Sequence, residues 1–128
     1  MDGQRTFRRA VDVLVDVSLQ AASRAGTALA ELDLVVPHQA NRRITQLVTE
    51  RLGLEAARVV DCIADYGNTT AGTLPLALDY AEQRGQLRPG SRVLLTAFGA
   101  GLTWGGTVVT WGKAPMGAAG LEPATSRV

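Results

Sequence analysis

The sequence predicts an α/β fold, in which a mixed but mostly parallel sheet is covered by helices. Two observations support this prediction. Short apolar runs alternate with longer runs of helical periodicity, an order typical of parallel strands joined by helices. The last two strand-like runs are separated only by "GAGL", which is too short for a crossover helix. The last strand should therefore be antiparallel to its neighbour.

The first part of the chain has the pattern helix, strand, helix. Apolar residues at helical spacing predict a helix over about 5–25, which Gly26 would end. The run "LDLVV" predicts a buried strand that ends at Pro37. Asn41 is a suitable N-cap for a second helix, whose apolar face would end at Gly53.

The second part predicts another strand, a helix and a final pair of strands. The run "RVVDCI" indicates a strand over 58–63, and "DYGNTTAG" after it indicates a loop. A helix is expected over 73–85, where Pro75 is tolerable only in the first turn. The runs 92–98 and 103–111 predict the last two strands.

Composition limits the classes of protein that remain. The 128 residues suffice for one domain, which we expect over 1–111, and 112–128 lose periodicity and predict a disordered tail. Thirteen Lys and Arg against 12 Asp and Glu argue against a general nucleic-acid binder. No apolar run approaches membrane-spanning length, so no membrane partner is expected. The single cysteine, Cys62, excludes an internal disulfide and fits the cytoplasm.

Polar loops follow the predicted parallel strands. His38 and Asn41 follow the first strand, Asn68 follows the second, and "FGAGLTWG" follows the third. Because the carboxyl ends of parallel strands meet at one edge of a sheet, these loops should converge. A histidine and carboxamides there could donate hydrogen bonds to a developing oxyanion. Taken singly, each also has a plainer interpretation, as a satisfied loop histidine, a helix cap or a turn residue.

Four segments together carry a specific resemblance. "MDGQRTFRRAV", "PHQANRRI", "DYGNTTAGTLPLAL" and "LRPGSRVLLTAFGAGLTWG" resemble, in order and spacing, the C-terminal half of β-ketoacyl-acyl carrier protein synthase III. The resemblance covers residues 1–111. It implies a thiolase-like fold and an acyltransferase. The implied reaction is the decarboxylative Claisen condensation of acyl-CoA with malonyl-acyl carrier protein that starts fatty-acid synthesis.

The resemblance also implies roles for individual residues. His38 and Asn68 match the histidine and asparagine that donate hydrogen bonds to the malonyl thioester carbonyl. No metal and no bound cofactor is implied, since acyl-CoA and the phosphopantetheine of acyl carrier protein are substrates. Further positions match the pantetheine channel (Gly3, Phe7, Asn41) and the surface that docks acyl carrier protein (Arg42, Arg43).

The sequence departs from the family pattern in one large respect. The nucleophilic cysteine of the family lies in an N-terminal half that this sequence does not contain, and Cys62 does not match its position. The first strand of this half would also lie upstream, and we expect its absence to leave a gap in the middle of the sheet. The chain should therefore be stable and active only with an N-terminal half, as part of a homodimer.

Two other functions stay open at this level. Relatives with the same fold start polyketide chains or transfer acyl groups in secondary metabolism, and primer selectivity cannot be read from these residues. Alternatively, the chain is an inactive fragment that only docks acyl carrier protein through Arg42 and Arg43. The first alternative is an enzyme with a different substrate, and the second is a binding module without chemistry.

Overall fold

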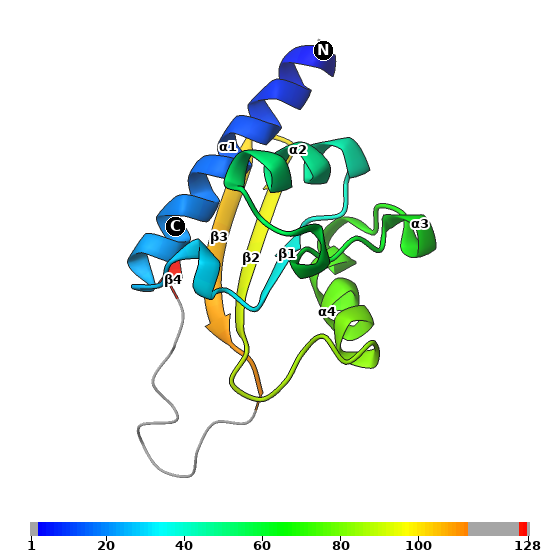
Figure 1. Cartoon of the computed structure of the whole chain (residues 1–128). Coiled ribbons are helices and arrows are strands. Elements are labelled where there is room, and N and C mark those ends of the chain that lie inside the picture. The colour runs from blue at the N-terminus through cyan, green and yellow to red at the C-terminus, as the bar shows by residue number, and fades with distance from the viewer. Residues whose placement is uncertain (1–2, 113–125, 128) are drawn as a thin grey trace.

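The computed structural model describes residues 3–112 and 126–127, and Figure 1 shows their arrangement. The α-helices are α1 (Gly3–Arg24), α2 (Arg42–Leu52), α3 (Ile63–Tyr66) and α4 (Thr73–Gln83). Short 3-10 helices are η1 (Leu29–Glu31), η2 (Ala56–Arg58) and η3 (Thr70–Gly72). The strands are β1 (Leu34–Pro37), β2 (Arg92–Gly99), β3 (Thr103–Thr110) and β4 (Ser126–Arg127). The predicted long helices and three of the four predicted strands are thus confirmed.

The sheet has the mixed character that the sequence predicts. Its strand order is β1-β2-β3-β4. Strand β1 is parallel to β2, with Leu34 opposite Val93, and β2 forms a tight antiparallel hairpin with β3. The short β4 pairs antiparallel with β3. Its two residues belong to the predicted disordered tail, so that prediction is wrong for them, while 113–125 and 128 lie outside the described residues.

The predicted strand over 58–63 is wrong. In its place the chain forms η2, a single parallel bridge between Val35 and Val59, and then α3. The Val60 amide donates to the Val35 carbonyl, so the next bond of a parallel ladder would need an N–H from residue 37. That residue is Pro37, which has none. The side chain of Gln39 donates to the Val60 carbonyl instead, at 3.1 Å.

The expected gap in the middle of the sheet is also wrong. Strands β1 and β2 pair directly along the whole length of β1. The pairing continues beyond both ends of β1, since the Asp33 amide donates to the Arg92 carbonyl and the His38 amide to the Thr96 carbonyl. The described sheet is therefore continuous from β1 to β4, with no open gap between its strands.

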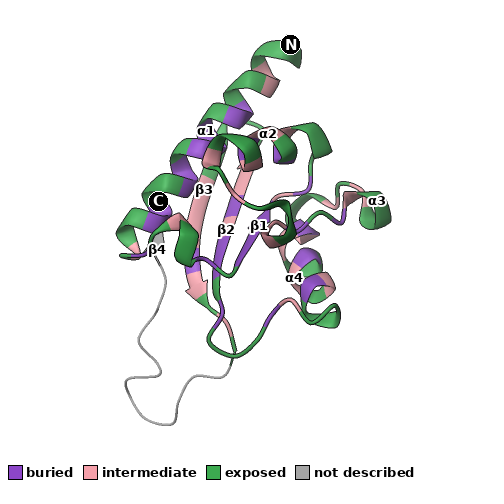
Figure 2. Ribbon diagram, in the orientation of Figure 1, coloured by how far each residue is buried: buried purple, intermediate pink, exposed green. Residues whose placement is uncertain are grey.

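Helices cover both faces of this sheet. Figure 1 shows α1 beside β3 and α4 beside β1. Figure 2 shows buried residues on β1, on β2 and on the adjoining helix faces, whereas β3 is mostly half-buried or exposed. Alternate residues of β1 divide between the two cores, because successive side chains in a strand point to opposite faces. Leu34 and Val36 pack with Ala77 of α4, whereas Val35 packs with Ala21 of α1. None of the described helices combines the length and the apolar composition that crossing a membrane requires.

Candidate active site

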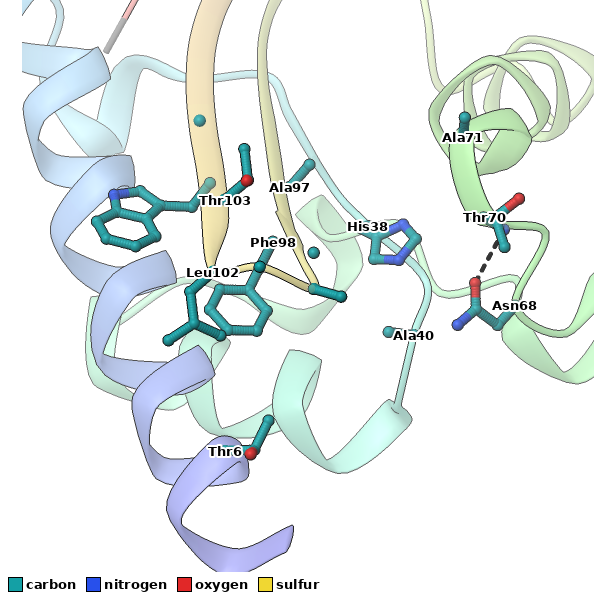
Figure 3. Close-up of a pocket in the computed structure, with 15 residues that line it drawn as sticks. Thr6, His38, Ala40, Asn68, Thr70, Ala71, Ala97, Phe98, Leu102 and Thr103 are labelled. Atoms are coloured by element: carbon teal, nitrogen blue, oxygen red, sulfur yellow. Dashed lines mark hydrogen bonds between the residues drawn. The ribbon is translucent and has the colours of Figure 1, made fainter. Parts of the chain in front are cut away.

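A cavity of about 840 Å³ lies at the carboxyl ends of β1 and β2. Its lining comes from the loop after β1, the loop after α3, the β2–β3 hairpin and Thr6 of α1. His38 and Asn68 both line it, and Figure 3 shows them on the side opposite Leu102 and Phe98. The convergence of three loops that the sequence predicts is confirmed, although only two of the loops follow strands.

His38 is placed by the end of the parallel ladder. Its backbone amide donates to the Thr96 carbonyl at 2.8 Å, one residue beyond Pro37. The side chain is half-buried in the cavity wall, and this burial lowers the pKa of the imidazole from its ordinary value. Around neutral pH the ring is therefore uncharged, with one N–H donor and one acceptor nitrogen.

Asn68 is placed by local turn geometry. Its Oδ1 accepts a hydrogen bond from the Thr70 amide at 2.9 Å, an Asx turn (Figure 3). The turn fixes the orientation of the carboxamide, because a carboxamide has one acceptor end and one donor end. The Nδ2 group then points away from Thr70, and it is the donor that this side chain offers to a ligand.

Thr70 has an uncommon backbone conformation. Its φ of 53° is the only positive φ of a non-glycine residue in the described part of the chain. A β-branched residue in the left-handed region costs on the order of 1–3 kcal/mol, and such strain is concentrated at functional sites. The strain here lies two residues after Asn68, in the residue whose amide orients the Asn68 carboxamide.

The cavity joins polar donors to an apolar wall. Opposite His38 and Asn68, the lining is formed by Ala97, Phe98 and Leu102. Two N–H donors in a setting of low polarity stabilise a negative oxygen more strongly than the same donors do in water. The arrangement thus suits a carbonyl oxygen that gains charge during a reaction.

Comparison with known families gives this geometry a context. The family described as "3-Oxoacyl-[acyl-carrier-protein (ACP)] synthase III C terminal" matches residues 22–111, well over half of the chain. The chain belongs to the synthase III family. The matched segment includes His38, Asn68 and the hairpin turn of the cavity.

Individual synthase III proteins agree with this assignment. "Beta-ketoacyl-[acyl-carrier-protein] synthase III 3" of Streptomyces coelicolor is 50% identical over 111 residues, which is 87% of this chain and 33% of that protein. The synthase III of Chlorobium phaeobacteroides is 42% identical over 110 residues, 86% of this chain and 33% of that protein. This chain therefore spans about a third of the length of the curated relatives that it matches.

Solved synthase III structures share the fold. The enzyme of Thermus thermophilus superposes with a TM-score of 0.85 at 46% identity, covering 88% of this chain and 35% of that one. The Pseudomonas aeruginosa enzyme gives 0.84 at 44% identity, with 88% and 36% covered. The priming β-ketosynthase of the R1128 polyketide pathway gives 0.81 at 38% identity, with 86% and 33% covered. The thiolase-like fold class predicted from the sequence is thereby confirmed.

The residues predicted for the pantetheine channel do not line this cavity. Gly3 is the first residue of α1, and Phe7 packs one turn further along against the core between α1 and α2. Asn41 is the N-cap of α2, where its Oδ1 accepts from the Arg43 amide at 2.8 Å. The helix-cap interpretation of Asn41 is confirmed, and the channel role of all three stays a prediction.

The two arginines predicted for docking lie at the start of α2. Arg42 forms an ion pair with Asp61 at 3.1 Å, with both side chains well exposed. The guanidinium of Arg43 lies 5.3 Å from the centre of the Phe7 ring, a cation–π contact. Arg43 therefore connects α2 to α1, and its role in docking remains a prediction.

Cys62 is a core residue. It is buried and packs with Val36, Val60 and Ala77. Burial raises the pKa of its thiol, and the nearby carboxylates of Asp61 and Asp65 raise it further. A thiol held protonated in this way is a poor nucleophile. The interpretation of Cys62 as a small buried residue is confirmed.

Sequence reasoning missed several residues that shape the site. The apolar side chains of the β2–β3 hairpin were not among the predicted site residues, yet they form one wall of the cavity. Thr70 gave no indication of its conformation, because β-branched residues disfavour positive φ. Gln39 was not among the predicted site residues, although its side chain is buried and hydrogen-bonded to the backbone at Val60 and Cys62.

Proposed function

We propose that this chain is the part of a β-ketoacyl-acyl carrier protein synthase III that holds and activates the malonyl thioester. The observation that carries the proposal is the placement of His38 and Asn68 on one apolar-walled cavity. Membership in the family supports the reaction class. The nucleophilic cysteine, on this proposal, belongs to an N-terminal half of the complete homodimeric enzyme.

The proposed reaction has two stages. First, an acyl group passes from acyl-CoA to the sulfur of the nucleophilic cysteine, and CoA leaves as the thiol. Malonyl-acyl carrier protein then loses CO2, and the electron pair of the broken C–C bond forms an enolate. The N–H of His38 and the Nδ2–H of Asn68 hold the enolate oxygen. The enolate carbon attacks the acyl thioester and expels the cysteine thiolate, which gives β-ketoacyl-acyl carrier protein.

The remaining predicted residues would serve the second substrate. Gly3, Phe7 and Asn41 would flank the phosphopantetheine arm, and Arg42 and Arg43 would meet the acidic surface of acyl carrier protein. Arginine suits this role because its planar guanidinium can bind carboxylate groups in a bidentate manner. The ion pair of Arg42 with Asp61 is exposed and therefore weak enough to exchange for a partner's carboxylate.

A chimeric synthase tests the proposal. In it, this chain replaces the 111-residue segment that it matches in the Streptomyces coelicolor relative, which supplies the remaining two thirds of the protein. His38→Ala and Asn68→Ala should each slow malonyl decarboxylation by about 100- to 1000-fold, since one oxyanion donor is lost. Transfer of the acyl group to the cysteine should be largely unchanged, because neither donor takes part in it.

The matched control is Gln83→Ala, which removes a carboxamide bonded to Asp79 on the exposed surface of α4. This variant should have the parent's rates in both half-reactions. Equal loss of acylation and decarboxylation in His38→Ala and Asn68→Ala would contradict the division of labour. The chain by itself, without the N-terminal half, should not turn over acyl-CoA and malonyl-acyl carrier protein.

A second candidate function is the start of polyketide chains. The likeness to the R1128 priming β-ketosynthase, at a TM-score of 0.81, favours keeping it. The same two donors would serve both functions, and only the acyl-CoA primer would differ. Competition between acetyl-CoA and longer or branched acyl-CoA substrates distinguishes the two, when it is measured on the complete enzyme.

A further inference from the structure

Gln39 is a buried carboxamide whose two N–H donors and oxygen all form hydrogen bonds with the backbone. It is only 2% exposed. Its Nε2 donates to the Pro37 carbonyl at 2.8 Å and to the Val60 carbonyl at 3.1 Å. Its Oε1 accepts from the Cys62 amide at 3.0 Å. One side chain thus joins the segment that carries His38 to a segment more than twenty residues away.

The second segment leads directly to Asn68. Cys62 is the residue before α3, a helix of four residues that ends at Tyr66. Gly67 and Asn68 follow at once. The path from the Gln39 bonds to the Asn68 side chain is therefore short and includes a single helical turn. No strand supports this path, because the parallel ladder stops where Pro37 lacks an N–H.

We propose that Gln39 is a positioning residue that fixes the His38 and Asn68 donors relative to each other. This inference rests on the function proposed above and adds a residue to it. Gln39 is next to His38 in the chain, and it clamps the start of the segment that presents Asn68. It touches no substrate in this role, since it acts only through the two loops that it joins.

The hydrogen-bonding pattern around Gln39 requires a carboxamide side chain. The site needs two N–H donors for two carbonyl oxygens and one acceptor for an amide. A carboxamide provides this set, whereas a carboxylate would place an oxygen against the Pro37 and Val60 carbonyls. Methionine has a similar length and can fill the space, but it would leave three buried backbone groups without these partners.

The test uses Gln39→Met and Gln39→Glu in the chimeric synthase, with Gln83→Met as the matched control on exposed α4. Both Gln39 variants should lower kcat for malonyl decarboxylation by about 10- to 100-fold, the usual consequence of a small misplacement of reacting groups. The KM for malonyl-acyl carrier protein and the rate of cysteine acylation should change less than threefold. A purely structural role would instead lower both half-reactions with the amount of folded enzyme.

A double-mutant cycle tests whether Gln39 acts through the donor. If it does, Gln39→Met should have a smaller effect in the Asn68→Ala background than in the parent, because the donor to be positioned is gone. Independent, multiplicative effects of the two substitutions would overturn the proposal. So would normal decarboxylation in Gln39→Met while His38→Ala and Asn68→Ala are impaired. Full activity of both His38→Ala and Asn68→Ala would instead contradict the proposed function itself, and the positioning role of Gln39 would fall with it.

Hydrogen exchange measured by mass spectrometry gives a readout that needs no turnover. Gln39→Met should speed exchange in peptides that cover 35–43 and 59–70, whereas Gln83→Met should leave both unchanged. Faster exchange in both peptides supports a clamp between the loops even in an inactive chimera. Unchanged exchange in 59–70 would show that Gln39 does not hold the Asn68 segment, and it would overturn the proposal.

Discussion

Asn41 and Asn68 form the same local structure in two different loops. The Oδ1 of Asn41 accepts from the Arg43 amide at 2.8 Å, and that of Asn68 accepts from the Thr70 amide at 2.9 Å. Asn41 thereby starts the 11-residue helix α2. Asn68 instead precedes a residue with a φ of 53° and lines the cavity. Identical short-range bonding therefore serves a helix cap in one loop and an oriented donor in the other.

The two loops also differ in what holds them. The His38 loop continues from β1, whose residues are buried on both faces of the sheet. The Asn68 loop follows no strand and depends on α3, the Asx turn and the Gln39 side chain. We therefore expect packing changes in the buried strand β1 to alter stability mainly, and changes in the Asn68 loop to alter activity mainly.

The largest effect on stability is expected in β1. Leu34 is 1% exposed and packs in the core under α4, so Leu34→Ala should lower the free energy of unfolding by about 2–5 kcal/mol. Leu74→Ala, in the helix that follows the Asn68 loop, should cost less because Leu74 is only partly buried. Thermal unfolding of the chimeric synthase measures both, and equal shifts in the midpoint would contradict the difference between the two sides.

The paired asparagines give the next largest effect. Asn41→Ala removes the N-cap of α2 and should lower stability by about 0.5–2 kcal/mol. Asn68→Ala removes no such cap, because the N-cap of α4 is Gly72, so its cost in stability should be smaller. The order should reverse for decarboxylation, where Asn68→Ala is the more damaging. If the same variant were the more damaging in both thermal unfolding and decarboxylation, the two asparagines would not have the different roles proposed here.

Features of the fold that depend on neighbouring residues could be predicted from the sequence. The apolar spacing of α1 and α2, the cap at Asn41 and the hairpin at Gly99 all follow from nearby residues, and the structure has them. The strand predicted over 58–63 failed for a non-local reason, because it depends on the N–H that Pro37 lacks. The position of Gln39 between two loops could not be read either, since the sequence does not show which side chains become buried.

A smaller effect is expected at Thr70. Asn tolerates the left-handed region better than Thr, so Thr70→Asn should raise stability by up to about 1 kcal/mol. The backbone amide that orients Asn68 is kept, so the decarboxylation rate should stay near that of the parent. Thr70→Ala is the control, because it also removes the side-chain hydroxyl but does not favour a positive φ. Equal stability of the two variants would show that Thr70 is not strained.

The smallest effect is expected when the pH is lowered, because only one of the two donors, His38, can take up a proton. Among the described residues that line the cavity, His38 is the only one that titrates, and burial lowers its pKa below the ordinary 6.5. As the pH falls through 6.5, the unfolded chain therefore takes up this proton before the folded chain does. Folding stability then declines with falling pH, and the decline stops once the pH is below the folded pKa.

His38→Gln removes this contribution and keeps a polar side chain of related size. Unfolding midpoints of the chimeric synthase at pH 7.5 and about 5.5 should therefore fall more in the parent than in His38→Gln. Asn68→Ala should keep the parent's pH dependence, since a carboxamide does not titrate. The same loss on acidification in the parent and in His38→Gln would mean that His38 titrates as it does in the unfolded chain. The imidazole would then not be held in the neutral form that its burial favours.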